Sequence, residues 1–273
     1  GVMYAREMHR ILGEVYYLRG DYANALIRFG SYVAETPQPQ RSALYMQGMS
    51  YYQTGVYSKA AAALGEVVTV NDALTQNAYL HLGLSYLQLM EKNKARMAFE
   101  QAAASNADMK VKEQAAYNYA LCIHETSFSA FGESVTVFER FLNDFPNSVY
   151  REKISSYLVD VYLNTRSYEA ALKSIERISK PSTQILEAKL KILFQLGTQS
   201  FANAAFQQAI DYFNQAIALG TYNRQTHADA CYWRGESYYR IDKMQEAARD
   251  FSEYLRLNRQ TNTEMYALAH YNL

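Results

Sequence analysis

The chain has 273 residues, 49% of them hydrophobic, and it carries 27 Lys and Arg residues against 27 Asp and Glu residues. This composition is sufficient for a sizeable core, and the balanced charge excludes a global basic field that would attract nucleic acid or an anionic membrane surface. No apolar run approaches the roughly 18 residues that a membrane-spanning helix needs. Cys122 and Cys231 lie far apart, without a CxxC or Cys/His cluster, so we expect two buried thiols rather than a disulfide framework or a zinc site.

Proline is confined to four positions outside the apolar periodic segments: Pro37, Pro39, Pro146 and Pro181. A proline inside a helix costs about 3 kcal/mol, so this placement leaves long uninterrupted helices possible. The sequence therefore predicts an all-α fold.

A pattern with a regular period opens the chain, marked by Gly13, Gly48 and Gly83. A tyrosine follows each glycine after three residues, an alanine follows after twelve, and a Phe or Leu comes four residues after that alanine. Residues three or four apart share a helix face, so the glycine and tyrosine belong to a first helix, and the alanine and large apolar residue to a second. Glycine and alanine are small where antiparallel helices approach closely, which predicts a helical hairpin for each copy.

The best copy is the first, where Leu12, Gly13, Tyr16, Ala25, Phe29 and Pro37 follow the pattern W-x2-L-G-x2-Y, then A-x3-F, then P. The chain thus resembles the tetratricopeptide repeat, a family of helical hairpins of about 34 residues. The resemblance implies an all-α, right-handed superhelical solenoid of about seven hairpins plus the start of an eighth.

Seven copies and a partial one form a single predicted array over residues 1–273. They span about residues 6–40, 41–75, 76–110, 111–148, 149–181, 182–223, 224–260 and, for the partial copy, 261–273. Because the eighth copy stops just before its expected glycine, whereas a repeat array normally closes with a polar capping helix, we expect a fragment of a longer protein.

Three copies are irregular. In the fourth, the segment 126–133 is about two residues too long, and Phe128 and Phe131 within it are either an exposed contact point or a cover for the hairpin. In the fifth, Val159 takes the place of the glycine, and its bulk is expected to open the helix pair. The sixth begins with an unusually long first helix in the run PSTQILEAKLKILF.

In the family, first-helix positions line a concave wall that binds an extended or helical segment of another protein, and the register transfers those positions to this chain. The predicted groove contains Tyr17, Tyr45, Met49, Tyr52, Leu84, Tyr117, Leu121, His124, Phe194, Phe201, Tyr232 and Tyr239. The same transfer also includes Glu14, Leu80, Leu87, Asp160 and Glu236. Such a groove is aromatic and aliphatic, which suits a partly apolar protein segment.

Tyrosine doublets occur at Tyr16/Tyr17, Tyr51/Tyr52 and Tyr238/Tyr239. We expect the first member of each doublet to pack in the core, whereas the second either lines the groove or packs against the adjacent repeat. The asparagine of the family's carboxylate clamp is replaced in the seven copies by Glu14, Met49, Leu84, Leu121, Asp160, Thr198 and Glu236. None of these can take its role, so a co-chaperone that binds acidic C-termini is not expected.

The junction FPNSVY, residues 145–150, is similar to junctions of bacterial cell-envelope members of the family, such as the outer-membrane assembly lipoprotein and the accessory protein of the Tol and Pal system. This similarity implies a periplasmic or cell-envelope location, with the cytoplasm as the alternative. The other interpretation is structural, because Pro146 and Ser148 are also suited to ending one helix and beginning the next.

Signatures of enzymes are absent from the sequence, which has no HExxH, GxxxxGK[ST] or GxSxG motif and no GxGxxG after a strand. The adjacent pair His124 and Glu125 is better suited to a surface or packing role than to acid/base chemistry. We therefore expect a non-enzymatic scaffold, without cofactor or metal, that binds another protein or peptide and neither binds nucleic acid nor inserts into a membrane. The alternative is a structural spacer or self-association module within a larger protein.

Overall fold

The computed structural model describes residues 1–127 and 131–261, and all regular secondary structure in these residues is helical. The described helices are α1 (Val2–Leu18), α2 (Tyr22–Glu35), α3 (Arg41–Gln53), α4 (Tyr57–Gly65), α5 (Ala73–Gln88), α6 (Lys92–Ala104), α7 (Met109–Thr126), α8 (Glu133–Asp144), α9 (Arg151–Asn164), α10 (Tyr168–Glu176), α11 (Thr183–Ala202), α12 (Phe206–Ala218), the 3-10 turn η1 (Gly220–Tyr222), α13 (Arg224–Arg240) and α14 (Met244–Thr261). Among them, none combines the length and apolarity needed to cross a membrane.

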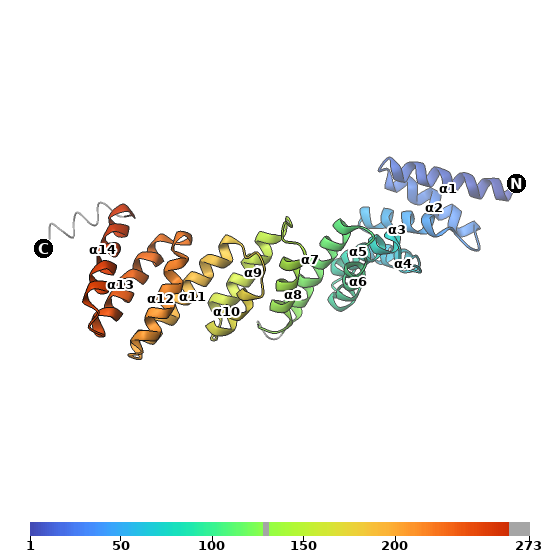
Figure 1. The fold of residues 1–273 in the computed structure, drawn as a ribbon. Helices are drawn as coiled ribbons and strands as arrows, with labels where there is room; N and C mark the ends of the chain where they lie inside the picture. The colour runs from blue at the N-terminus through green and yellow to red at the C-terminus, as the bar shows by residue number, and fades with distance from the viewer. Residues whose placement is uncertain (128–130, 262–273) are drawn as a thin grey trace. The chain divides into compact units, whose positions relative to one another are not determined.

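The chain divides into two compact units, Gly1–Val137 and Phe138–Leu273. Within unit 1, α1 packs on α2, α3 on α4 and α5 on α6, and each second helix also packs on the next first helix (Figure 1). Within unit 2, α11 packs on α12 and α13 on α14, again with α12 against the following α13. The predicted all-α class and succession of helical hairpins are confirmed. The single array over residues 1–273 stays a prediction, and the expected eighth copy lies outside the described residues.

The predicted close approach at each repeat glycine is present in both units. A Cβ atom added to Gly83 in unit 1 would lie 2.4 Å from the ring of Phe99, and one added to Gly197 in unit 2 would lie 2.5 Å from the ring of Phe213. Both rings are fully buried. Since carbon atoms attract best at about 3.5–4.0 Å, even a methyl group does not fit there without a shift of the second helix.

The turn inside each hairpin has the same backbone geometry in five copies. The residue seven positions after the glycine has a left-handed φ of 57–79°; these residues are Gly20, Gly55, Met90, Ala204 and Asp242. The amide of the residue that follows donates to the carbonyl of the tyrosine or serine five positions earlier, as in the Schellman motif. The turn therefore ends each first helix and sends the chain back along it.

Polar contacts also join consecutive hairpins of unit 1. The Arg41 guanidinium at the start of α3 donates to both carboxylate oxygens of Asp72, the N-cap of α5, at 2.8 Å each. The buried amide of Gln76 donates to the carbonyls of Ala102, Ser105 and Asp108 and accepts from the amide of Asp108 at 2.8 Å. The Arg41 pair links the start of α3 to the start of α5. The Gln76 bonds hold α5 against the end of α6 and the start of α7, because a buried amide is costly unless it is bonded.

The irregular copies have structural counterparts. The loop residue Phe128 lies outside the described residues, and Phe131 is half-buried. In the fifth copy, α9 contacts α11 more extensively than it contacts α10, and Val159 lines the hollow between α9 and α11, so the expectation that its bulk opens the α9–α10 pair stays a prediction. The sixth copy has the predicted long first helix, since α11 runs for 20 residues. The junction 145–150 connects α8 to α9, with the hydroxyl of Ser148 accepting from the amide of Tyr150.

Candidate functional site: the first-helix faces of the two units

Three tyrosines predicted for the groove lie on adjacent first helices of unit 1, in the order Tyr17 on α1, then Tyr45 and Tyr52 on α3. The amide of Asn77 on α5 donates to the Tyr45 hydroxyl at 2.5 Å, and the Asn77 carbonyl accepts from Nδ1 of His81 at 2.8 Å. The His81 ring meets the Tyr52 ring edge-on, with 4.9 Å between centroids. We name these five residues the tyrosine–histidine row.

The tyrosine–histidine row is uncharged at neutral pH. Burial raises the pKa of Tyr17 to about 12, and the neighbouring Tyr45 and Tyr22 add to this effect. Burial also raises the pKa of Tyr45 and of Tyr52 and lowers the pKa of His81. Since Nδ1 of His81 donates to the Asn77 carbonyl, Nε2 of the neutral ring is an acceptor. The row thus presents aromatic surface with hydrogen-bonding groups and no net charge.

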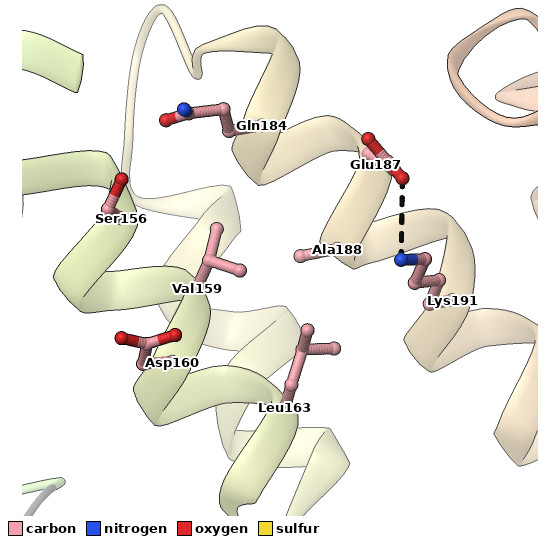
Figure 2. Close-up of a pocket in the computed structure, with 8 residues that line it drawn as sticks. All are labelled: Ser156, Val159, Asp160, Leu163, Gln184, Glu187, Ala188 and Lys191. Atoms are coloured by element: carbon pink, nitrogen blue, oxygen red, sulfur yellow. Dashed lines mark ion pairs between the residues drawn. The ribbon is translucent and has the colours of Figure 1, made fainter. Parts of the chain in front are cut away.

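Unit 2 has a hollow of about 230 Å³ on the corresponding face, between the first helices α9 and α11 (Figure 2). It is lined by Ser156, Val159, Asp160 and Leu163 from α9 and by Gln184, Glu187, Ala188 and Lys191 from α11. Figure 2 shows Val159 and Leu163 directed toward α11 and Ala188 directed toward α9, with charged side chains around them. The hollow therefore has an apolar floor and a polar edge that carries both signs of charge.

A second hollow of about 300 Å³ continues along the same face toward α13. It is lined by Leu163, Tyr168, Lys191, Ile192, Phe194, Gln195 and Thr226, so it shares Leu163 and Lys191 with the first hollow. We name the two hollows together the α9–α11–α13 groove.

The charged edge of the α9–α11–α13 groove is held by two contacts of Glu187. Its carboxylate pairs with Nζ of Lys191 at 3.3 Å and accepts from the amide of Asn223 at 3.1 Å. Asn223 is the N-cap of α13, since its side chain accepts from the amide of Thr226 at 3.0 Å. This chain of contacts ties α11 to α13 and places the Lys191 ammonium between the two hollows.

An aromatic cluster lies beyond the α9–α11–α13 groove on α11 and α13. Phe201 and Tyr232 both contact the ring of Trp233, at 5.1 and 5.2 Å between centroids. The Arg240 guanidinium lies 5.5 Å from the Phe201 ring, within range of a cation–π contact. Tyr239 is 54% exposed and leaves a free aromatic surface at the end of α13.

The predicted groove residues differ in their solvent exposure. Half-buried members are Tyr17, Tyr45, Tyr52, Leu84, Leu121, His124, Phe194, Phe201 and Tyr232. Met49 and Tyr117 are buried, and Tyr239 is exposed. Of the further transferred positions, Leu80 is buried, Asp160 is exposed, and Glu14, Leu87 and Glu236 are half-buried. The structure brings Tyr17, Tyr45 and Tyr52 together in unit 1, and Asp160 and Phe194 together in the groove of unit 2.

Most residues that line the α9–α11–α13 groove, and Asn77 and His81 of the tyrosine–histidine row, were not among the predicted ones. Asn77 and Lys191 each lie six residues before a repeat glycine, Gly83 and Gly197, and so one turn earlier on the same helix face as the transferred positions. The helical period alone could have found them. His81 has no such signal, because only the contact with Tyr52 on the neighbouring helix places it in the row.

Among the described residues, no group of three or more His, Cys, Asp or Glu side chains could hold a metal ion. Both thiols are buried as predicted, and burial raises the pKa of Cys122 and of Cys231 to about 11, so neither is a thiolate at neutral pH. The carboxylate of Glu125, the neighbour of His124, forms an ion pair with Nζ of Lys92 at 3.2 Å.

A family model of the tetratricopeptide repeat matches residues 45–110 and 194–261, one stretch in each unit. No curated protein matches the chain significantly. Similar solved structures include a tetratricopeptide-repeat protein of Parabacteroides merdae, with 20% identity over 82% of each chain and a TM-score of 0.41. Another is the C-terminal part of a TPR repeat-containing protein of Cytophaga hutchinsonii, with 13% identity over 93% of this chain and 97% of that one and a TM-score of 0.47.

A third similar structure is the complex of the TPR2AB domain of yeast Sti1 with pHSP90. It shares 11% identity over 98% of this chain and 96% of that one, with a TM-score of 0.45. At these identities and TM-scores, none of the three structures carries information about the partner of this chain.

Proposed function

Because the chain belongs to the tetratricopeptide-repeat family, we propose that it is a non-enzymatic scaffold that binds an extended segment of another protein in the α9–α11–α13 groove. An array of helical hairpins offers an extended surface formed by its first helices, and such a surface suits a protein-interaction role.

The observation that carries this proposal is the continuity of the two hollows. They share Leu163 and Lys191, and their linings come from three successive first helices of unit 2 together with Tyr168 at the start of α10. Each hollow, at about 230 and 300 Å³, is at or below the lower end of the roughly 300–1,000 Å³ of a small-molecule pocket. A row of small hollows suits successive side chains of a peptide better than one compact ligand.

The residues that line the α9–α11–α13 groove also favour a particular kind of peptide segment. An extended peptide points alternate side chains to opposite sides, so every second residue can enter the groove. Apolar side chains of such a segment would pack on Leu163, Val159 and Ala188. The amide of Gln184 and the charged groups of Asp160 and Lys191 are suited to polar groups of its backbone and edges. We therefore propose a segment in which apolar and polar residues alternate.

The tyrosine–histidine row of unit 1 is proposed as a second contact surface. Tyrosine offers a large contact area and loses little side-chain entropy on binding. The edges of Tyr17 and Tyr52 and Nε2 of His81 would recognise a partly apolar, uncharged segment.

A bacterial cell-envelope location completes the proposal. Its support is the resemblance of the FPNSVY junction to those of envelope members of the family. Fractionation of the producing organism, followed by detection of the chain with an antibody, tests it. Recovery in the periplasmic or envelope fraction is expected, and recovery with cytoplasmic markers would contradict it.

Binding in the α9–α11–α13 groove is tested by charge reversal. The parent chain, Lys191→Glu and the control Lys180→Glu are used as baits in an extract of the producing organism, and captured proteins are identified by mass spectrometry. Lys180 is exposed in the turn before α11 and lines neither hollow. A protein captured by the parent and the control but lost with Lys191→Glu supports the proposal, provided that circular dichroism shows all three chains folded. Equal capture by all three, or no capture, would favour a structural spacer.

A further inference from the structure

A further hollow, of about 280 Å³, lies in unit 1 where the connection 66–72 passes from α4 to α5. It is lined by residues 68–71 of this connection, by Thr75, Gln76 and Tyr79 of α5, and by Gln101, Ala104 and Ser105 of α6. We name it the connection hollow. None of its lining residues belongs to the tyrosine–histidine row or to the α9–α11–α13 groove.

The early end of α4 leaves room for the connection hollow. This helix has 9 residues, whereas the second helices α2 and α6 have 14 and 13. It ends at Gly65, and the run VVTV that follows at residues 67–70 is β-branched throughout, which disfavours a longer helix. The chain therefore reaches α5 through an irregular connection, which forms one wall of the hollow.

Two networks hold the walls of the connection hollow in place. On one side, the Arg41 guanidinium donates to the carbonyl of Val67 at 2.7 Å and to the carboxylate of Asp72, so it fixes both ends of the connection. On the other side, the amide of Gln76, a residue that is only 1% exposed, donates to the carbonyl of Ser105 at 2.8 Å and fixes the end of α6. Fixed walls reduce the ordering cost that a ligand meets on binding.

Four side chains around the connection hollow have uncommitted hydrogen-bonding groups. They are Thr69, Asn71, Tyr79 and Gln101, whose side-chain polar atoms form no hydrogen bond within residues 1–127 and 131–261. Each group is a hydroxyl or a carboxamide, which both donates and accepts. A carboxylate only accepts, and an ammonium or guanidinium group only donates. The best match is therefore a ligand whose own groups both donate and accept.

The connection hollow also disfavours a charged ligand. Every residue that lines it is uncharged. The N-terminus of α5, which would attract an anion, already holds the carboxylate of Asp72, which accepts from the amide of Thr75 at 2.9 Å. The Arg41 guanidinium is paired with the same carboxylate. A charge that entered the hollow would lose contact with water, and no lining charge would offset this cost.

We infer that the connection hollow binds one ring of an uncharged sugar. Each sugar hydroxyl both donates and accepts, as the four uncommitted side chains do. The C–H groups of the ring would pack on Val68, Val70 and Ala104. At about 280 Å³, the hollow is just below the roughly 300 Å³ at which small-molecule pockets begin, so it suits one ring rather than several. A free sugar and the end of a longer glycan present the same groups to it.

Saturation-transfer NMR on the 273-residue chain tests the inference. The probes are the uncharged methyl glycosides of glucose, galactose, mannose and N-acetylglucosamine, with glucuronate and glucosamine as charged analogues. Transfer to at least one methyl glycoside is expected, with weaker transfer to the charged analogues. Ala104→Tyr, which fills the hollow, should abolish the transfer. The matched control Ala62→Tyr, on α4 outside the hollow, should preserve it. Both alanines are exposed, so both variants should keep the circular dichroism spectrum of the parent.

A second pair of variants measures the hydrogen bonds. Gln101→Ala should raise the Kd of the bound glycoside by about two- to tenfold, which is the effect of losing a neutral hydrogen bond. Gln88→Ala, at an exposed glutamine of α5 outside the hollow, should leave the Kd unchanged. Tighter binding of a trisaccharide that ends in the same sugar would support a glycan end as the ligand, and equal affinity would support a free sugar.

Three results would contradict the inference. The first is the absence of transfer to every methyl glycoside, or equal transfer in the parent and Ala104→Tyr. The second is stronger transfer to glucuronate or glucosamine, which would overturn the uncharged class. The third is tighter binding of N-acetylglutamine amide than of any glycoside, which would make the hollow a site for a carboxamide side chain of a protein.

Discussion

The replacement of Gly83 by alanine is the sharpest test of how the hairpins pack. The added Cβ atom would lie 2.4, 2.6 and 2.8 Å from three atoms of the Phe99 ring. To restore contacts of about 3.5 Å, the ring and α6 must move by roughly 1 Å. Phe99 is fully buried, so its ring has no open space to enter. Overpacking of this kind costs about 1–3 kcal/mol.

The same substitution at Gly30 is the matched control. Gly30 lies inside α2 in the same unit, and a Cβ atom there would meet no atom within 4 Å. Alanine is favoured over glycine in a helix interior by about 1 kcal/mol. This gain applies at both sites, so Gly30→Ala should stabilise unit 1. The difference in unfolding free energy between the two variants should equal the overpacking cost of about 1–3 kcal/mol.

The assay is denaturant unfolding followed by circular dichroism, comparing the same transition in the parent and both variants. The expected order of stability is Gly30→Ala, then the parent, then Gly83→Ala. If Gly83→Ala were as stable as Gly30→Ala, the contact between glycine and the Phe99 ring would not determine the packing of the hairpin, and the register would be wrong.

Three further predictions concern the turns and ion pairs. Met90→Gly should stabilise the chain by up to about 1 kcal/mol, because Met90 is exposed and has a φ of 61°, which is unfavourable for non-glycine residues; thermal melting measures this. The Arg41 guanidinium holds the pKa of Asp72 below its usual range, so the stabilisation is complete above about pH 4 and is lost as the pH falls through the lowered pKa. Acid unfolding should therefore begin at a higher pH in Arg41→Ala than in the parent. Asp72→Asn should remove the part of the pH dependence that comes from Asp72, while it keeps an N-cap acceptor. Arg177→Ala should cost about 1–3 kcal/mol in denaturant unfolding, because it removes the bidentate partner of the buried Glu139 carboxylate.

Each of these predictions can fail separately. A lower melting temperature for Met90→Gly would show that the left-handed turn is not strained. Acid-unfolding curves of Asp72→Asn and the parent that superimpose would show that the ion pair does not contribute. For Arg177→Ala, an unchanged midpoint would mean that water or another group replaces the guanidinium.

The hairpins could be predicted from the sequence because their cause is local. Gly83 and Phe99 are separated by a fixed number of residues, and the contact between them follows from helix geometry alone. The left-handed turn was harder to predict from the sequence. Gly20 and Gly55 suggest it, but Met90 and Ala204 adopt the same φ without any residue signal. There the requirement to close the hairpin overrides the backbone preference of the residue.

The site could be predicted only in part, because its cause is not local. The register placed Asp160 and Phe194 on the face where the structure has the two hollows, but the hollows also depend on the distance between α9 and α11. The burial of Met49 depends on side chains from α4 and α5, which a single-helix pattern does not contain. Contacts between repeats therefore limit what a repeat pattern can predict about a binding surface.

Site-specific photo-crosslinking tests the central claim most directly. A photoreactive amino acid replaces Leu163 in the α9–α11–α13 groove or, in a second sample, Leu255 on α14. The two leucines are 37% and 44% exposed, so accessibility does not distinguish them. In an extract of the producing organism, a discrete adduct is expected at position 163 and not at 255, and Lys191→Glu should abolish it. The same adducts at both positions, or none at position 163, would contradict binding in the groove.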